Sequence, residues 1–483
     1  MHDPGKGKAL FGAAALFFLL CVLLPFGALI FAGREARGLY DDTYYGELPL
    51  MAERLQAVQG RKIVVIGNSG AAFGVDTAQM EAALRADGWD CTVCGFGLYG
   101  SLGTRLMLDL AEESIGAGDV VLFMPELNEQ ALSMYFSAKD AWYALNGHES
   151  LLFRLSPELR GKLLGGYPAF VAESLRLKAA DEKPAPSGVY ARASFDERCD
   201  MKNAARDANT MEGLADGNHP ILLESALYDG AFVSYVNDYA ERVRRRGADF
   251  YYCFCPMNAA AAQGDADAFY DAVESLFGFP MLGCVQDSLL EAGWFVDSNF
   301  HLNSAGMTVF TWRLTEQVKA WLGDTGRTEL VLPDMPGAAA ARAVVDGDDT
   351  DEPCFRYAED DGGWRVVGVT EEGQARRELT VPCAHDGQPV VSVSADAFSG
   401  CRRTASITFQ QNIRRLPDGL FTGCMSLRAV TLRHTAPEQL SVGYHLLDGA
   451  PDIRVRVPRA ALSAFRNNYF WSAYSEVLTG YEE

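Results

Sequence analysis

Short apolar runs alternate with amphipathic stretches between residues 61 and 323, and this alternation restricts the chain to a few fold classes. The apolar runs cover residues 63–66, 120–124 and 250–255, with a shorter candidate at 92–94. Apolar side chains at helical spacing mark residues 76–86, 104–114 and 304–322. Apolar runs without polar alternation are typical of parallel strands that are buried on both faces. The pattern predicts an α/β domain whose parallel sheet is covered by helices.

The rest of the chain before the C-terminal third fits this alternation less well. Residues 33–60 are interpreted as a connector with a short helix at 48–58. Residues 131–246 form a long helical insertion, which we expect to cap or shape a site. Residues 326–352 are rich in Pro, Gly, Ala and Asp, a composition that favours a linker. The α/β domain is therefore predicted at residues 61–325.

The C-terminal part, residues 353–483, contains a repeat. The string A-F-S-G-C at residues 397–401 returns 23 residues later as L-F-T-G-C, and a degenerate copy begins 26 residues after that, at residue 446. A period in the twenties with short strand-forming segments predicts a leucine-rich-repeat β-solenoid. Residues 354–475 closely resemble the BspA-type leucine-rich repeats of bacterial surface proteins. The resemblance implies a fold and leaves the partner of the repeats open.

The N-terminus carries a run of 24 residues, 9–32, without a charged side chain. As a helix it would reach about 36 Å, enough to cross a bilayer. We therefore expect a cytoplasmic stub at residues 1–8, a transmembrane anchor at 9–32 and the bulk of the chain outside a cell membrane. A cleaved secretory signal is the alternative. The Lys and Arg residues that flank the run are balanced and do not decide its orientation.

Charge and cysteine content exclude some functions. The net charge is −22, and the acidic excess lies before the repeats, which argues against nucleic-acid binding. The eleven cysteines suggest no simple disulfide framework. Cys91 and Cys94 have metal-ligand spacing, but no second C-x-x-C and no nearby histidine complete a site. We expect neither a metal nor a cofactor.

Two stretches, 228 residues apart, carry the residues of one candidate active site. In the first, Ser69 follows the apolar run 63–66 and is flanked by Gly67 and Gly70. In the second, Asp297 precedes His301 by four residues. A serine among small residues can present its hydroxyl, and a carboxylate can orient a histidine that acts as its base. A helix N-cap is the alternative interpretation of Ser69.

The string I-G-N-S-G-A-A-F-G-V, which contains Ser69, resembles block I of the SGNH (GDSL-like) hydrolases. Asn68 stands where the family has aspartate. The family's last block is D-x-x-H, and here one more residue separates Asp297 from His301. The resemblance implies a three-layer, flavodoxin-like parallel sheet with a Ser-His-Asp triad of Ser69, His301 and Asp297.

Two further blocks of that family supply donors to the oxyanion. Gly97, in the string G-F-G-L-Y-G, is the best match for the block II glycine. Asn128, in the string P-E-L-N after the run 120–124, matches the block III asparagine, although a turn role is equally common for such a residue. The resemblance implies that the N–H groups of Ser69 and Gly97, with the Asn128 amide, hold the oxyanion.

These features predict a membrane-anchored, extracellular serine esterase or O-acyltransferase. By resemblance its substrate would be an ester-bearing glycan, such as one of the cell envelope, or a small ester. The alternative is an inactive SGNH-fold surface protein that binds a protein partner through its repeats. Asn68 and the longer Asp–His spacing keep this alternative open. The predicted partners are therefore an ester, a protein and, through residues 9–32, a membrane.

Overall fold

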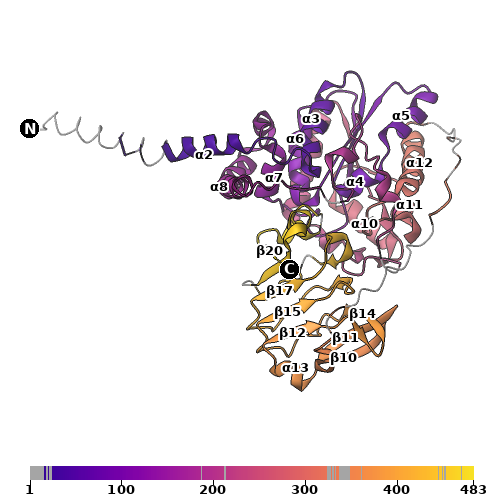
Figure 1. The fold of residues 1–483 in the computed structure, drawn as a ribbon. Coiled ribbons are helices and arrows are strands. Elements are labelled where there is room, and N and C mark those ends of the chain that lie inside the picture. Colours follow the sequence, from indigo (N-terminus) through magenta and orange to yellow (C-terminus); the bar gives the residue numbers. More distant parts are fainter. Residues whose placement is uncertain are drawn as a thin grey trace, which may run out of the picture.

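The computed structural model describes residues 24–482 with gaps, together with residues 16, 17 and 20. The gaps are residues 187, 212–213, 361, 444, 449, 451–452 and 469, and most of 324–348. Figure 1 shows an α/β body (residues 36–323) above a repeat region (residues 349–482), with helix α2 (Leu24–Glu35) projecting to one side. The two parts are described in turn because the candidate site lies in the first.

A five-stranded parallel sheet forms the centre of the α/β body. Its strand order is β2-β1-β3-β5-β8. The strands are β1 (Lys62–Gly67), β2 (Thr92–Gly97), β3 (Val120–Met124), β5 (Asp249–Cys253) and β8 (Met281–Leu282). Every residue of β1 and β3 is buried, as expected for central strands with helices on both faces. All four pairings are parallel.

Helices connect and cover these strands, because parallel neighbours require long crossovers. In Figure 1 the strands lie between α3 and α6 on one side and α5 and α12 on the other. The bounds of these helices are α3 (Glu47–Ala57), α4 (Ser69–Gly74), α5 (Thr77–Ala86), α6 (Thr104–Glu112), α9 (Gly230–Arg245), α10 (Ala266–Leu276), α11 (Val285–Ser288) and α12 (Ser304–Trp321). The helices expected at 48–58, 76–86, 104–114 and 304–322 are confirmed to within two residues.

The predicted insertion, residues 131–246, is only partly helical. It contains α7 (Ala138–Leu145) and α8 (Pro157–Ala179), which pack together. Its last helix, α9, packs on β5 and is the crossover from β3 to β5. The segment between α8 and α9 has little regular structure, with β4 (Ile221–Leu222) paired to β7 (Ala262–Gln263). A second short two-stranded sheet pairs β6 (Met257–Asn258) with β9 (Leu289–Leu290).

The prediction of a membrane-spanning helix over residues 9–32, and with it of a single-pass membrane protein, is wrong for the described part of the chain. No helix among the described residues is long and apolar enough to cross a membrane. Helix α2 has 12 residues, about 18 Å of helix against a hydrocarbon core of about 30 Å. The stub 1–8 and residues 9–15, 18–19 and 21–23 of the predicted anchor lie outside the described residues.

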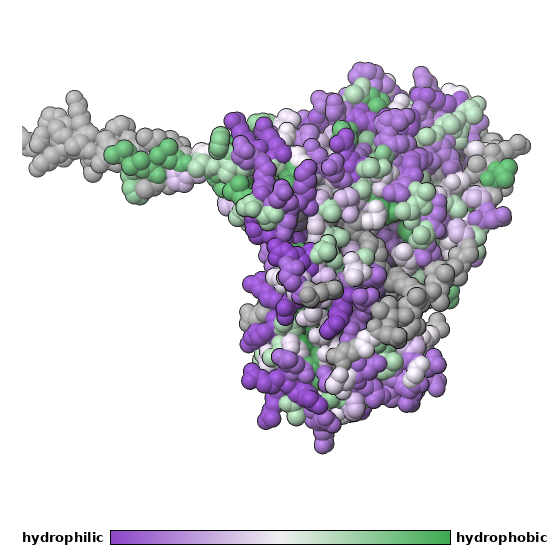
Figure 2. Space-filling model, in the orientation of Figure 1, coloured by the Kyte–Doolittle hydropathy of each residue, from purple (hydrophilic) through white to green (hydrophobic). Residues whose placement is uncertain are grey.

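The end of α2 is fastened to the α/β body. Gly33 is buried against α8, where a Cβ atom would collide with the hydroxyl of Tyr167. The amide of Asn146 donates to the Gly33 carbonyl at 3.2 Å. Further toward the N-terminus the apolar side chains Phe26 and Phe31 are exposed, as Figure 2 shows for the projecting helix.

The repeats contribute strands to a parallel five-stranded sheet, whose order is β12-β15-β17-β19-β20. Its strands are β12 (Glu378–Val381), β15 (Ser406–Phe409), β17 (Ala429–Leu432), β19 (Arg454–Pro458) and β20 (Leu478–Tyr481). Equivalent positions pair across neighbouring repeats, for example Ile407 with Val430, and both are buried. Phe398 and Phe421, one in each copy of the repeated string, are also buried. The repeat positions therefore supply the core of this region.

A second sheet in the repeat region has the order β10-β11-β14-β13, and β16 (Arg415–Leu416) pairs with β18 (Ser441–Val442). The strands of the second sheet are β10 (Phe355–Asp360), β11 (Gly363–Val369), β13 (Ala384–His385) and β14 (Gln388–Val393). Helices α13 (Glu371–Ala375) and α14 (Leu462–Asn467) are short. The pairs β10–β11 and β13–β14 are antiparallel. The second is a tight hairpin in which Asp386 and Gly387 both have positive φ.

The predicted fold class needs correction as a whole. It combined a three-layer flavodoxin-like sheet, a transmembrane helix and a leucine-rich-repeat β-solenoid. The described residues instead have mixed α/β structure distributed over several sheets, mostly parallel, with antiparallel pairs in the repeat region. Hairpins form there because short turns join successive strands, whereas the crossovers of the α/β body are long enough for helices.

The repeat region contacts the α/β body at α7, at α8 and at the segments around residues 182 and 218. The ring of His219 stacks on Phe470 with 5.0 Å between centroids, and Phe470 packs against the cores of both parts. Polar contacts also join the two parts: Asn218–Ser441 at 2.8 Å, Arg466–Glu173 at 3.1 Å and Lys139–Ser475 at 2.8 Å. The loop that carries Asn218 and His219 is therefore held from both sides.

Candidate active site

Ser69 lies at the carboxyl end of β1, where the chain turns into α4. Gly67 is required before it, because a Cβ atom there would collide with the carbonyl of Met124. Asn68 makes no side-chain cap bond to α4. Its amide nitrogen contacts the Thr104 hydroxyl at 3.3 Å, and that hydroxyl donates to the Ala131 carbonyl at 2.7 Å. Asn68 therefore fastens the serine turn to its neighbours without carrying a charge.

Asp297 and His301 lie in the loop before α12 and reach Ser69 from the other end of the chain. His301 Nδ1 is 2.8 Å from an Asp297 oxygen, and His301 Nε2 is 2.9 Å from the Ser69 oxygen. The backbone of this loop is closed by a hydrogen bond from Val296 N–H to the His301 carbonyl at 2.9 Å. The four-residue spacing thus accommodates an Asp–His contact, and the three predicted residues lie together.

The three side chains differ in their access to solvent. Ser69 and His301 are 0 % exposed. The Asp297 side chain is 18 % exposed. Phe73 of α4 stacks on the His301 ring with 4.3 Å between centroids. In this conformation the serine and histidine are closed off, so a substrate requires some movement of the chain around them.

Tyr190, which the sequence did not single out, completes the surroundings of Asp297. Its hydroxyl donates to the second Asp297 oxygen at 2.6 Å and lies 3.1 Å from His301 Nδ1. Burial and the negative charge of Asp297 raise the pKa of Tyr190 well above its ordinary value, so it remains a donor. The residue lies in the predicted insertion, 107 positions from Asp297, and no local pattern marks it.

The connector also contributes to the site, through Tyr44. Tyr44 and Tyr190 meet edge to face at 5.6 Å, and Tyr99 stacks on Tyr190 at 5.8 Å. Burial and the negative charges of Glu126 and Asp297 raise the pKa of Tyr44. Residues 44–46 form a short 3-10 helix before α3. The predicted connector 33–60 therefore packs beside the candidate triad.

Glu126 is the second residue that sequence reasoning missed, although the string P-E-L-N was noted for Asn128. Its Oε1 atom accepts hydrogen bonds from the Ser69 hydroxyl and from the Gly70 N–H, both at 2.6 Å. The same oxygen lies 4.0 Å from His301 Nε2. Glu126 is 0 % exposed. The Ser69 hydroxyl is thus in contact with both a buried carboxylate and the histidine.

The two predicted oxyanion residues make different contacts near Ser69. Asn128 donates its amide to the second oxygen of Glu126 at 3.0 Å and accepts from the Ala131 N–H at 2.8 Å. Gly97 packs against the serine turn, where an added Cβ would lie 2.6 Å from the Asn68 carbonyl and 3.2 Å from Ala72 N. The structure thus brings Asn128 to the carboxylate that contacts Ser69, and Gly97 against the backbone of the serine turn.

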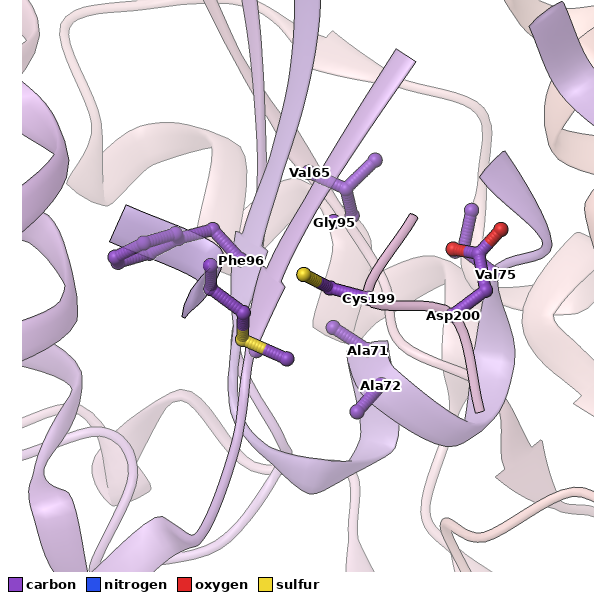
Figure 3. Close-up of a pocket in the computed structure, with 10 residues that line it drawn as sticks. Val65, Ala71, Ala72, Val75, Gly95, Phe96, Cys199 and Asp200 are labelled. Atoms are coloured by element: carbon purple, nitrogen blue, oxygen red, sulfur yellow. The ribbon is translucent and has the colours of Figure 1, made fainter. Parts of the chain in front are cut away.

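A cavity of about 10 Å³ lies next to Gly97. Figure 3 shows Cys199 and Asp200 beside Ala71 and Ala72 of α4 at this cavity. Such a volume holds about one water molecule, so it is no substrate site. Asp200 accepts a hydrogen bond from the Thr77 hydroxyl at 2.8 Å, which attaches the Cys199 segment to α5. The cavity is therefore part of the packing behind the serine.

Two carboxyl groups near this cavity have raised pKa values. Burial raises the pKa of Glu47 from 4.5 to about 7, and that of Asp200 from 3.8 to about 6. Each group therefore binds its proton more tightly in the folded chain than in the unfolded chain. Their contribution to stability is present in full below the unfolded pKa and is lost as the pH rises through the folded value.

Replacing Glu47 with Gln should therefore flatten the pH dependence of stability. Between about pH 5 and about pH 8, titration of Glu47 should lower the free energy of unfolding of the wild type by about 2 kcal/mol. This part of the decrease should be absent from Glu47→Gln. Urea unfolding at both pH values measures the difference. A variant whose stability falls as steeply as that of the wild type would contradict the assignment to Glu47.

Arg206 connects the serine helix α4 to the loop that carries His301. It is 0 % exposed, and its guanidinium donates to the carbonyls of Phe73 and Leu302 at 2.5 Å and of Met201 at 2.9 Å. Burial lowers the pKa of Arg206 to about 10, so it is still charged at neutral pH. Because Phe73 belongs to α4 and Leu302 follows His301, this side chain fixes the serine helix to the histidine loop.

Metal ligation has no candidate in the described part of the chain: no group of three or more His, Cys, Asp or Glu side chains there could hold an ion. Cys91 and Cys94 are free and buried, and burial raises the pKa of Cys94 to about 11. These thiols therefore belong to the packing of β2 and the turn before it.

Comparison with known proteins gives little. No protein-family model matches the chain, and no curated protein matches it. Among solved structures, the crystal structure of the T. pallidum leucine-rich-repeat protein matches with 22 % identity over 24 % of this chain, and the matched part spans about half (52 %) of that structure. The TM-score is 0.18, too low to support an argument about fold. The chain thus has a weak, low-coverage likeness to a leucine-rich-repeat protein.

Proposed function

We propose that the chain is a serine ester hydrolase or O-acyltransferase. The observation that carries this proposal is the line of hydrogen bonds from Asp297 through His301 to Ser69, at 2.8 and 2.9 Å. This is the arrangement of nucleophile, base and orienting carboxylate that acyl transfer requires. The resemblance of the serine string to block I of the SGNH hydrolases supports the same chemistry.

In the proposed reaction His301 Nε2 takes the Ser69 proton while the serine oxygen attacks an ester carbonyl carbon. Asp297 contacts Nδ1 of the imidazole, orients the ring and stabilises its positive charge. Tyr190 in turn donates a hydrogen bond to Asp297. The tetrahedral intermediate collapses when the alcohol leaves with the proton from His301. Water or a second hydroxyl then attacks the acyl carbon while His301 takes its proton; the bond from this carbon to the Ser69 oxygen breaks, and His301 returns the proton to that oxygen. The substrate class is an O-acyl ester, of a glycan or of a small molecule.

A second candidate function is binding without catalysis. The observation that favours it is the complete burial of Ser69 and His301, together with the carboxylate of Glu126 at the serine. In that case the repeat region would bind a protein partner and the α/β body would support it. The two candidates differ in one measurable property, the reactivity of Ser69.

A fluorophosphonate probe separates them, because it reacts with a serine that a histidine activates. The full chain is incubated with the probe, and peptide mass spectrometry locates the adduct, in parallel with hydrolysis of a short-chain aryl ester. We expect the adduct on Ser69 and loss of both reactions in Ser69→Ala. Ser133→Ala is the matched control, because Ser133 lies in the loop after β3 and donates to the Gln130 carbonyl at 3.2 Å. Absence of labelling and turnover in the wild type, with no reaction gained by removing the Glu126 side chain, would favour the binding protein.

A further inference from the structure

Glu126 occupies a particular place in the candidate site. Its Oε1 atom lies 2.6 Å from the Ser69 oxygen and 2.6 Å from the Gly70 nitrogen, and its Oε2 atom accepts from the Asn128 amide at 3.0 Å. One backbone N–H, one side-chain amide and the serine hydroxyl therefore all point at a single carboxylate. The chain also leaves room for it, since a Cβ atom on Gly70 would lie 3.0 Å from Glu126 Cγ.

These donors have the character of an oxyanion site. When a serine attacks an ester, the carbonyl oxygen comes to lie next to the serine oxygen and becomes negatively charged, and N–H donors within about 3 Å of it stabilise that charge. In the present conformation Glu126 Oε1 lies in this position beside Ser69 and the Gly70 N–H, and the other oxygen of the same carboxylate, Oε2, accepts from the Asn128 amide. Two negatively charged oxygens cannot occupy the same position, so a substrate carbonyl can enter only after the carboxylate has left.

The serine proton leads to the same conclusion. Ser69 has one hydroxyl proton, which can go to Glu126 Oε1 at 2.6 Å or, when the ring proton of His301 is on Nδ1, to His301 Nε2 at 2.9 Å. While the proton is donated to Glu126, it is not donated to the base that must remove it. The carboxylate thus competes with the substrate for its place and with His301 for the serine.

We propose that Glu126 is an internal inhibitor that fills the oxyanion site of the resting chain, and that the Gly70 N–H and the Asn128 amide are the oxyanion donors that it uncovers when it moves away. This proposal rests on the proposed function. It assigns to Gly70 a role that the sequence resemblance gave to Gly97, which packs against the Asn68 carbonyl. Departure of the Glu126 side chain is then the step that turns the site on.

The test compares the second-order rate of fluorophosphonate labelling at Ser69 in the wild type, Glu126→Ala and Glu126→Gln. We expect Glu126→Ala to react at least about tenfold faster, which corresponds to about 1.4 kcal/mol. Glu126→Gln keeps the volume and an acceptor oxygen but loses the charge, so its rate should lie between the two. Glu129→Ala is the control, because Glu129 is an exposed carboxylate three residues further along the same loop and should leave the rate unchanged.

Added acetate provides a second readout. It should enter the space left in Glu126→Ala and slow labelling in proportion to its concentration, whereas the wild type, which fills the site itself, should be insensitive. Thermal unfolding of each variant checks that it is folded. If Glu126→Ala does not fold, Glu126→Gln alone decides: a rate above that of the wild type supports the proposal, and an equal or lower rate overturns it.

The possible failures are distinguishable. If the wild type is labelled at Ser69 but a folded Glu126→Ala is labelled no faster, the inhibitory role is overturned while the proposed function stands. If neither the wild type nor a folded Glu126→Ala is labelled, the proposed function falls and the inhibitory role with it. Labelling confined to Glu126→Ala supports both.

Discussion

Asp297→Asn should lower kcat on a short-chain aryl ester by about 10⁴-fold, with a much smaller change in KM. The asparagine amide can keep the 2.8 Å contact to His301 Nδ1, but it supplies a donor where the imidazole needs an acceptor. The histidine is then held in the wrong tautomer, and its positive charge is no longer stabilised when it takes the serine proton. Steady-state kinetics on the full chain measures the effect.

Tyr190→Phe is the informative comparison for this prediction. It removes the hydroxyl that donates to the other Asp297 oxygen at 2.6 Å and leaves the carboxylate in place. A hydrogen bond to a charged group is worth about 1.5–3 kcal/mol, so a loss of kcat of roughly 10- to 150-fold is expected. An Asp297→Asn variant that stays within tenfold of the wild type would show that another group orients His301.

Arg206→Met should lower the free energy of unfolding by about 3 kcal/mol. Methionine fills much of the volume but leaves the carbonyls of Phe73, Leu302 and Met201 without their buried donor. The net loss is smaller than the sum of these bonds, because the guanidinium is itself costly to bury, as its lowered pKa indicates. Urea unfolding that is monitored by tryptophan fluorescence gives the change in midpoint and slope.

Arg192→Met is the control for Arg206, since Arg192 is exposed and lies in the same insertion. It should change stability by less than about 0.5 kcal/mol. Fluorophosphonate labelling of Ser69 should also be slower in the Arg206 variant, because the side chain that hydrogen-bonds to both the serine helix and the histidine loop is lost. A folded Arg206→Met with unchanged stability would contradict the structural role described above.

The elements that could be predicted are those with a local signal. Strands β1 and β3 follow from apolar runs, and α5, α6 and α12 from helical spacing, because these patterns are read over a few neighbouring residues. Ser69 was found for a similar reason, as a serine among small residues at a strand end, and Asp297 and His301 because they lie close together in the chain.

Where a local signal was followed without its context, the prediction failed. The charge-free run 9–32 has the composition of a membrane anchor, but no helix among the described residues is long and apolar enough to cross a membrane, and the end of α2 packs against α8. Composition states what a segment could bury. It does not state whether the segment is buried at all: Phe26 and Phe31 of this run are exposed, and the buried residue of α2 is Gly33, which lies against Tyr167 of this same chain.

The residues that surround the candidate triad could not have been predicted, because their partners are distant in sequence. Arg206 meets Phe73 across 133 positions, and Tyr190 meets Asp297 across 107. Glu126 was within a noted string, yet nothing in that string says that its side chain, and not that of Asn128, reaches the serine. Such contacts arise only when the sheet brings strand ends together.

The amino-acid sequence alone was sufficient for the order of the central elements and for the choice of Ser69, Asp297 and His301, since periodicity and short spacings act locally along the chain. Only the tertiary structure decided that the serine and histidine are buried, that Tyr190 and Arg206 hold their loops, and that the Glu126 carboxylate fills the position next to Ser69. The physical reason is that burial and charge interactions depend on distances in space, and the packing of the whole α/β body determines those distances.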